Sequence, residues 1–281
     1  MAVKKAETGS LHIDALKQGR LRLTLVGATP FYFNAMSGKA KRTLLIGGGK
    51  KSAAERKELK HDPENEFRDS IYRLPDGETL LGFPAPGVKG AMATAALETA
   101  GVTKTSVQRL IFLPEMKIKM WGAPYLKMDV VRSADMNKTP DVRTRAFLPR
   151  WVAEVTIAYV QPTLSKHSIV SLLQNAGAVV GIGDFRQEKG RGSFGTFSVT
   201  DDSGMDTDGI DHTDYIAEIK QEGREAQEAA MESPVCFDDD TRELMQFLQE
   251  ERYRPHGLHR RDQAGGSRGA GSRYGVSGVL R

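Results

Sequence analysis

Alternating hydrophobic and polar residues predict the strands of this chain. Leu21, Leu23 and Leu25 alternate with Arg22 and Thr24, the period of two expected of a strand with one buried face and one polar face. Similar alternation or short apolar runs recur through the first 199 residues. The strands that these patterns predict lie at about residues 21–25, 79–84, 110–113, 116–120, 155–159 and 194–199.

Two segments between these strands carry helix signals. Residues 87–100 are rich in alanine, which favours a helix, and Gly101 supplies a stop. Ser165 is a suitable N-cap for a second helix, whose apolar residues fall at the i, i+3, i+4, i+7 spacing of one face. The order of strands and helices predicts an α+β domain with an antiparallel or mixed sheet and helices on one of its faces.

Two long segments interrupt that order. Residues 36–78 have little apolar periodicity and are rich in lysine and arginine, which predicts a basic insertion after the first strand. Residues 121–150 also have few periodic signals and form a second long connection. Insertions of this length inside a compact domain are usually functional or disordered.

Charge divides the chain into three parts. Residues 1–199 carry 30 basic and 18 acidic side chains, residues 200–251 carry 3 basic and 17 acidic ones, and residues 252–281 carry 7 basic and 1 acidic. We therefore expect a basic domain at 1–199, an acidic linker with helices at 200–253, and a disordered Gly/Arg-rich tail at 254–281. The strongest helix signal in the acidic part is 240–252. A basic body raises the local concentration of polyanions.

Several classes of protein are not expected. No apolar run is long enough to span a membrane and the N-terminus lacks a secretion signal, which predicts a soluble, cytoplasmic protein with no membrane partner. Cys236 is the single cysteine, so a disulfide or a thiolate-rich zinc site within the chain is excluded. The six histidines show no metal-ligand spacing, and no cofactor is expected.

The segment 181–197, GIGDFRQEKGRGSFGTF, is the first candidate for binding chemistry. It does not fit the phosphate loop of nucleotide hydrolases or the dinucleotide pattern, and LLIGGGKKS fails the phosphate-loop spacing as well. Glycines allow backbone amides to face phosphate oxygens, which basic neighbours would neutralise. The alternative is a turn that merely ends a helix. The binding candidates are Gly181, Gly183, Arg186, Lys189, Arg191 and Gly192.

The second candidate is the stretch 120–151, where basic and aromatic residues are interleaved. Basic groups can hold a nucleic-acid backbone while aromatic faces stack on unpaired bases, which indicates a single strand. In the alternative interpretation, Trp121, Phe147 and Trp151 belong to the core and only the arginines are exposed. The basic residues of this stretch are Lys127, Arg132, Lys138, Arg143, Arg145 and Arg150.

The helix and loop at 165–199 resemble the glycine-rich C-terminal signature of the RAMP superfamily of CRISPR-associated proteins. FPAPGVKGAMATAAL, at 83–97, is similar to the Lys-Gly element that opens the first helix in that superfamily, with Lys89 and Gly90 in the Lys-Gly positions. The long connections and the lack of an obvious catalytic pair are most similar to Cas7-like backbone subunits.

This resemblance implies a modified RRM-like, ferredoxin-like domain with an antiparallel sheet and two long insertions that grip guide RNA. It implies a non-catalytic subunit that repeats along single-stranded RNA as a homo-oligomer, beside other CRISPR-type subunits. Lys89 and the basic residues of 181–197 would contact phosphates, and residues 121–151 would wedge between bases.

Other functions stay open. The chain could be a phage or mobile-element protein that mimics or inhibits a CRISPR complex, or a sequence-tolerant single-stranded DNA-binding protein. An endoribonuclease would use His61 or Asp62, a dipeptide for which the sequence reveals no positioned partner. A further hypothesis is that the acidic residues 200–251 cover the basic surface of the free protein.

Overall fold

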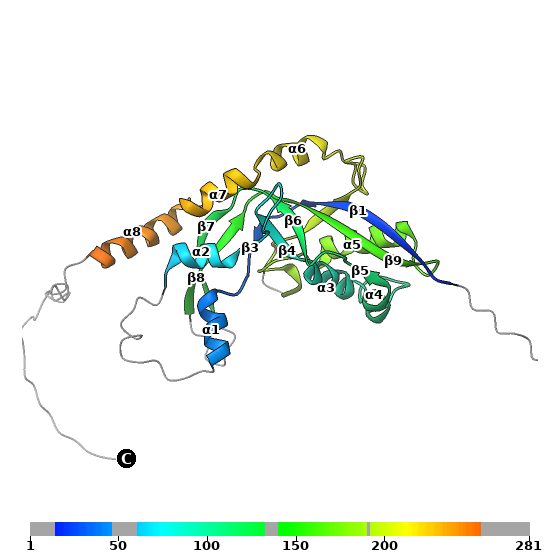
Figure 1. The fold of residues 1–281 in the computed structure, drawn as a ribbon, viewed down its shortest axis with the longest axis horizontal. Helices are drawn as coiled ribbons and strands as arrows, with labels where there is room; N and C mark the ends of the chain where they lie inside the picture. Colours follow the sequence, from blue (N-terminus) through cyan, green and yellow to red (C-terminus); the bar gives the residue numbers. More distant parts are fainter. Residues whose placement is uncertain (1–14, 47–60, 133–139, 190–191, 254–281) are drawn as a thin grey trace, which may run out of the picture.

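The centre of the protein is a seven-stranded antiparallel sheet (Figure 1). The computed structural model describes residues 15–46, 61–132, 140–189 and 192–253, which form an α+β protein with two antiparallel sheets and eight α-helices. The strand order is β10-β1-β9-β6-β4-β3, and β5 also pairs with β9. These strands are β1 (Lys17–Gly27), β3 (Tyr72–Arg73), β4 (Leu81–Pro84), β5 (Ile111–Phe112), β6 (Lys117–Trp121), β9 (Val152–Gln161) and β10 (Phe197–Thr200).

The longest pairing joins β1 to β9, with Lys17 opposite Gln161 and Val26 opposite Val152. Leu23 and Leu25 are buried, while Arg20 and Arg22 are exposed. The predicted alternation is therefore confirmed, because one face of β1 contributes to the core and the other carries the basic side chains.

Helices cover the apolar face of this sheet. Helix α3 (Ala85–Ala95) packs against α5 (Lys166–Val179) and against α4 (Lys104–Leu110), and the three lie together in Figure 1. Ser165 caps α5 as predicted, since its side chain accepts a hydrogen bond from the Ser168 N–H. The predicted apolar face of α5 is also confirmed, and its buried residues include Ile169, Leu172, Leu173 and Ala176.

The second sheet overturns the prediction of an irregular connection at 121–150. Strands β7 (Tyr125–Arg132) and β8 (Pro140–Leu148) form an antiparallel hairpin, and β2 (Phe31–Tyr32) pairs with β8. Residues 144–148 of β8 are all buried, including Arg145, so the alternation that marks a strand is absent. Trp121, Phe147 and Trp151 are buried in the core, as the alternative interpretation held.

The insertion at 36–78 is partly regular. Helix α1 (Gly38–Ile46) and helix α2 (Pro63–Ser70) both lie within it, and β3 adds an edge strand to the large sheet. Phe67 of α2 is fully buried in the core. No hydrophobic periodicity marks this helix, because α2 has a single large apolar side chain among charged and polar residues.

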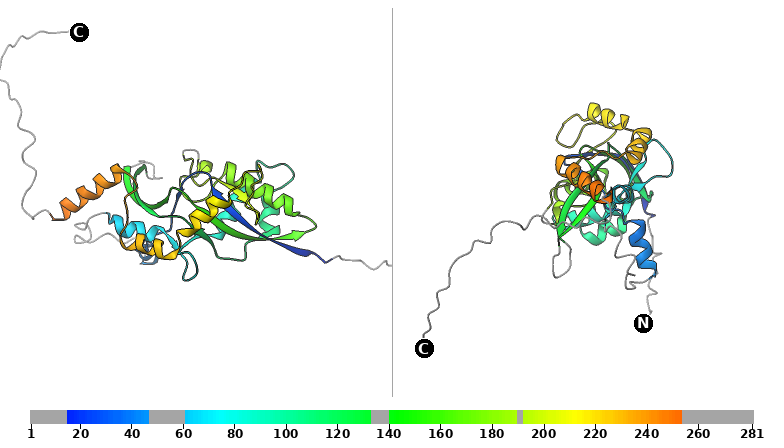
Figure 2. Two further views of the ribbon diagram at one scale, coloured as in Figure 1. Left: turned by 90° about the horizontal axis from the view of Figure 1, so that it is seen from above. Right: turned by 90° about the vertical axis from the view of Figure 1, so that its left-hand side faces the viewer.

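Three helices follow the last strand and pack against the body. They are α6 (Thr213–Gln221), α7 (Arg224–Glu232) and α8 (Asp239–Tyr253), the last of which confirms the helix predicted at 240–252. Ile219 of α6 packs against Trp121 and Val152, and Met231 of α7 joins the main core. The three helices run along one side of the molecule toward the β7–β8 hairpin (Figures 1 and 2).

None of the described helices is long and apolar enough to cross a membrane. The tail predicted at 254–281 lies outside the described residues.

Gln227 fixes α7 to the sheet through a buried hydrogen-bond network. Its Oε1 accepts the Leu80 N–H at 2.8 Å, and its Nε2 donates to the Glu222 carbonyl at 2.9 Å. A buried polar side chain of this kind is costly to remove because its partners stay buried.

We expect Gln227→Ala to lower the free energy of unfolding by about 2 kcal/mol, because the Leu80 N–H would remain buried without an acceptor. Urea unfolding of the full chain measures this, with Gln246→Ala on the exposed face of α8 as the matched control. Equal stability of the two variants would contradict the anchoring role.

Candidate nucleic-acid interface

The backbone amides of the glycine segment are used inside the protein. Ile182 N–H donates to the Gly195 carbonyl at 2.9 Å, Asp184 N–H to the Tyr32 carbonyl at 3.1 Å, and Gly195 N–H to the Pro30 carbonyl at 2.8 Å. Gly181 N–H likewise donates to Ala176. The expectation that these amides face a phosphate is therefore wrong for these four groups.

Close backbone packing explains two of the glycines. Gly183 has φ +89°, and a Cβ there would lie 2.7 Å from the Tyr32 carbonyl oxygen. A Cβ on Gly192 would lie 1.6 Å from the Phe185 carbonyl oxygen. Any side chain would force these chain segments apart, so packing alone requires glycine at both positions.

The cations of this segment are only partly described. Arg186 forms an ion pair with Glu188 at 3.2 Å, and its side chain is only 23% exposed. Lys189 ends a short 3₁₀ turn, but its side chain lies outside the described part of the structure, as does the whole of Arg191. A role of these residues in phosphate binding stays a prediction.

Lys89 makes a local contact on α3. Its Nζ donates to the Gln108 carbonyl in the last turn of α4 at 2.8 Å and lies 5.6 Å from the centre of the Phe112 ring. A cation near the C-terminus of a helix is favourable, so this contact has a structural explanation.

The β7–β8 hairpin displays the basic residues of the second candidate stretch. Arg132 lies opposite Pro140 and Arg143 opposite Asp129, which places the two arginines on opposite faces of the hairpin. Both are exposed, and within the described residues neither forms an ion pair. Lys138 was the other basic candidate of this part of the sequence, and it falls outside the described residues.

Arg145 connects the hairpin to the glycine segment. Its Nη2 lies 3.0 Å from Asp184 Oδ2, and its guanidinium lies 5.1 Å from the centre of the Phe185 ring. Arg145 is only 8% exposed, and its Nη1 has no hydrogen-bond partner. Burial lowers the pKa of Arg145, while the charge of Asp184 acts in the opposite direction. The sequence did not indicate Asp184, because the two residues are distant along the chain.

A cavity of about 630 Å³ opens beside Arg145, and we call it the β8 cavity. It brings together the insertion, the hairpin and the glycine segment. His61 lies in its wall, with Nδ1 3.0 Å from Glu66 and Nε2 3.3 Å from Asp141. The polar and charged residues that line the cavity are Asn34, Ser37, His61, Glu66, Ser70, Asp141, Arg143, Thr144, Arg145 and Asp184.

The carboxylates Glu66 and Asp141 supply the partners for His61 that the sequence did not reveal. Neither was predicted, because no spacing rule connects α2 to the start of β8. Across the described ranges, no three His, Cys, Asp or Glu side chains are grouped as ligands for a metal ion.

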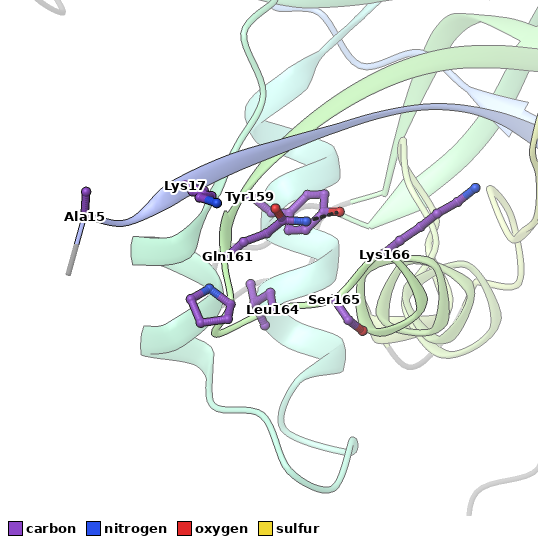
Figure 3. A pocket seen from close by; sticks show the side chains of 8 residues that line it. Ala15, Lys17, Tyr159, Gln161, Leu164, Ser165 and Lys166 are labelled. Carbon is purple, nitrogen blue, oxygen red and sulfur yellow. Dashed lines mark hydrogen bonds between the residues drawn. The ribbon is translucent and has the colours of Figure 1, made fainter.

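A second hollow, of about 520 Å³, lies where β1 and β9 meet the start of α5 (Figure 3). Lys17 and Lys166 lie at its rim, and the Tyr159 hydroxyl accepts a hydrogen bond from Gln161 Nε2 at 3.3 Å. None of the predicted binding residues lines it, so the β8 cavity and the hairpin form the candidate interface.

The acidic segment neutralises part of the predicted basic stretch. Glu218 of α6 accepts two hydrogen bonds from Arg150, at 2.7 and 2.8 Å, and Asp238 pairs with Lys127. Arg132 and Arg143 are left exposed. The acidic segment thus pairs with two basic residues of the stretch, although Arg150 itself stays exposed, whereas Arg132 and Arg143 have no paired carboxylate within the described residues.

The ion pair of Asp238 predicts a loss of stability in acid. Burial raises the pKa of Asp238, but hydrogen bonds from Lys127 and Thr241 outweigh it and bring the pKa to about 2, from an ordinary 3.8. A lowered carboxyl pKa stabilises the fold above about pH 4, and this contribution is lost as the pH falls toward 2.

We expect Asp238→Asn to lower the free energy of unfolding at pH 7 by about 1 kcal/mol, a modest amount because solvent screens the partly exposed pair. At pH 2, where about half of the native Asp238 carboxyl is protonated, the difference between the variant and the wild type should shrink to a fraction of its value at pH 7. Urea titrations at both pH values measure this, with Asp240→Asn, in the first turn of the helix that Asp238 precedes, as the control. A constant difference at both pH values would refute the ionic origin.

Comparison with known proteins adds no identity to these observations. No family model matches the chain, and no curated protein is significantly similar to it in sequence. The function is therefore inferred from the side chains of the hairpin and the β8 cavity.

Proposed function

We propose that this protein is a non-catalytic RNA-binding subunit, of the Cas7-like kind, that grips the backbone of a guide RNA in a CRISPR-type ribonucleoprotein. The order of elements supports an RRM-like, ferredoxin-like domain. The elements β1, α3, β6, β9, α5 and β10 follow one another along the chain, and their strands lie in the antiparallel order β10-β1-β9-β6. This order is the one expected of a split βαβ arrangement and supports that proposal, with the hairpin and the other elements as additions.

The observation that carries the proposal is the basic hairpin. Arg132 and Arg143 are exposed on its two faces, with no carboxylate paired to either within the described residues. Arginines in this setting are free to bind phosphates, and such contacts position a nucleic acid without reading its sequence.

Stacking contributes less to this proposal than charge does. Trp121, Phe147 and Trp151 are buried, so they are not available to unpaired bases. Val130, 73% exposed on β7, is the apolar side chain that the hairpin offers for a wedge. Affinity should therefore depend mainly on phosphate contacts and fall steeply with salt.

We expect Arg132→Ala/Arg143→Ala to weaken binding of a fluorescent single-stranded RNA. The slope of log K against log salt should become shallower by about 1.4, since each phosphate contact to a single strand contributes about 0.7. Anisotropy titrations at several salt concentrations measure both effects. The control variant Lys104→Ala/Arg109→Ala removes two exposed charges from α4. It should change both the RNA affinity and the salt slope less than the hairpin variant does.

Equal affinity and slope for the two double variants would exclude the hairpin as the binding surface. The same titration with single-stranded DNA separates the proposed function from a single-stranded DNA-binding protein. A DNA-binding protein of replication would bind DNA more tightly, whereas a guide-binding subunit would bind RNA more tightly. Co-purification with CRISPR subunits but without RNA would instead favour an inhibitor.

A further inference from the structure

We infer that the first half of β1 binds an extended, acidic segment of a partner protein as an additional strand of the large sheet. A row of backbone groups without strand partners follows this edge, and a hollow beside it can receive side chains. The inference goes beyond the proposed function, because it assigns a protein partner to a surface that the RNA-binding hairpin does not include.

Strand β1 is longer than the strand beside it. β10 pairs with β1 only from Thr24 to Gly27, whereas β9 pairs with it from Lys17 to Val26. Within the described residues, the segment 17–23 therefore has a neighbouring strand on one side alone. Figure 1 shows β1 and β9 running on together toward one end of the molecule. An unpaired edge of this kind is a template for a further strand.

The register decides which backbone groups of this edge are free. The Gly27 N–H donates to the Trp151 carbonyl, on the β9 side. The Ala28 N–H donates to the Thr196 carbonyl, on the β10 side. Because the direction of the backbone groups alternates along an antiparallel strand, those of the even-numbered residues of β1 point away from β9. The exposed residues whose outward N–H and carbonyl groups have no strand partner, across the described ranges, are Gln18, Arg20 and Arg22.

The edge of β10, by contrast, is covered by the protein itself. The Val199 N–H donates to Oε1 of Gln174 on α5 at 2.8 Å, and Thr200 forms a bridge with Asp206. Proteins protect edge strands by such contacts or by charged side chains, because an open edge invites pairing. The free part of β1 carries charges alone, and these repel only strands of the same charge.

The charges of this edge favour an acidic strand. Arg20 and Arg22 alternate with the buried Leu23 and so share the face of the sheet away from α5. Within the described residues, Arg20 forms no ion pair. Arg22 pairs with Glu154 at 2.6 Å, yet its side chain stays 63% exposed. Opposite charges on paired strands are stabilising and like charges are destabilising, so glutamate or aspartate suits the positions beside the two arginines.

The same rule disfavours this chain as its own partner. A second copy of β1 would place the arginines of one edge against those of the other. The C-terminal residues 252–281 are also basic, with 7 basic and 1 acidic side chains. The acidic residues of 201–253 lie in turns, isolated bridges and helices, so they are not available as an extended strand. The occupant is therefore a different protein.

The hollow of about 520 Å³ receives the other side chains of the added strand. In Figure 3, β1 passes over it and α5 begins beside it. Its walls include Tyr159 and Leu164, with Lys17 and Lys166 at the rim. The Tyr159 ring packs against Gly19, where a Cβ would lie 2.5 Å from the ring. Because successive side chains of a strand point to opposite faces, acidic residues beside the arginines must alternate with residues that face this hollow. The partner strand thus alternates acidic with apolar residues.

A fluorescent peptide of this pattern, Glu-Val-Glu-Leu-Glu-Val-Glu, tests the inference by anisotropy titration of the full chain. We expect saturable binding, about tenfold tighter than that of the same peptide with lysine in place of glutamate. N-methylation of the glutamate amides removes the donors that face β1 in antiparallel pairing and should weaken binding about tenfold. The peptide methylated on the valine and leucine amides is the matched control.

A substitution in β1 tests the same edge from the protein side. Gln18→Pro removes an outward N–H that β9 does not use, so the pairing of β1 with β9 should persist. It should weaken peptide binding about tenfold, whereas Gln18→Ala should leave it unchanged. Amide exchange followed by NMR should slow on peptide binding at Gln18, Arg20 and Arg22, but not at Gly19, whose N–H faces β9.

Absence of saturable binding, or equal binding by Gln18→Pro and Gln18→Ala, would overturn the inference. If the proline variant fails to fold, the two methylated peptides decide the outcome on the wild-type chain, and equal binding of both would overturn it as well. An edge that serves RNA instead would show reduced RNA affinity in Arg20→Glu and no peptide binding.

The RNA titrations keep this inference separate from the proposed function. Gln18→Pro should leave the affinity for single-stranded RNA unchanged. Failure of the peptide to bind, with RNA affinity still reduced by Arg132→Ala/Arg143→Ala, would remove this inference alone. Peptide binding with no effect of those two substitutions on RNA would remove the proposed function and leave a protein-docking edge.

Discussion

The buried ion pair between Arg145 and Asp184 is the contact on which the candidate interface depends. It ties the second sheet to the segment that leads from α5 to β10, and so holds the hairpin against the main domain. One terminal nitrogen of the guanidinium pairs with Asp184, while the other is buried without a hydrogen-bond partner. The same residue thus positions the hairpin and keeps one polar group buried without a partner, at a cost in stability that the ion pair and the packing offset.

The distribution of charge on the protein surface differs from the three charge blocks along the sequence. The reason is that the acidic segment, residues 200–251, folds onto the basic domain and pairs with some of its cations. Its helices pair Glu218 with Arg150 and Asp238 with Lys127, while burying Gln227 and Met231 against the sheet. These helices are therefore held by packing as well as by ion pairs. The exposed positive charge on the second candidate stretch that has no carboxylate partner, within the described residues, is carried by Arg132 and Arg143 at the hairpin.

The glycine segment illustrates how one composition suits two different purposes. Glycines that expose amides to a phosphate and glycines that let two backbones touch are identical in sequence. Here Gly183 lies against Tyr32, and Gly192 lies against Phe185. The partners are backbone carbonyls, which leave no trace in the residue types around them. The binding residues of the candidate site therefore lie mainly on the hairpin and around the β8 cavity.

The sequence by itself determined the elements whose periodicity is strong: β1, β9, the face of α5 and the helix α8. Local hydrophobic patterning and capping fix these, since each needs only neighbouring residues to be recognised. Tertiary structure alone decided the β7–β8 hairpin and the β8 cavity. Arg145 forms a buried ion pair with Asp184, and His61 contacts Glu66 and Asp141. The Arg145–Asp184 and His61–Asp141 contacts join segments that are distant along the chain. Such pairings depend on how strands and helices are brought together, and no local pattern encodes them.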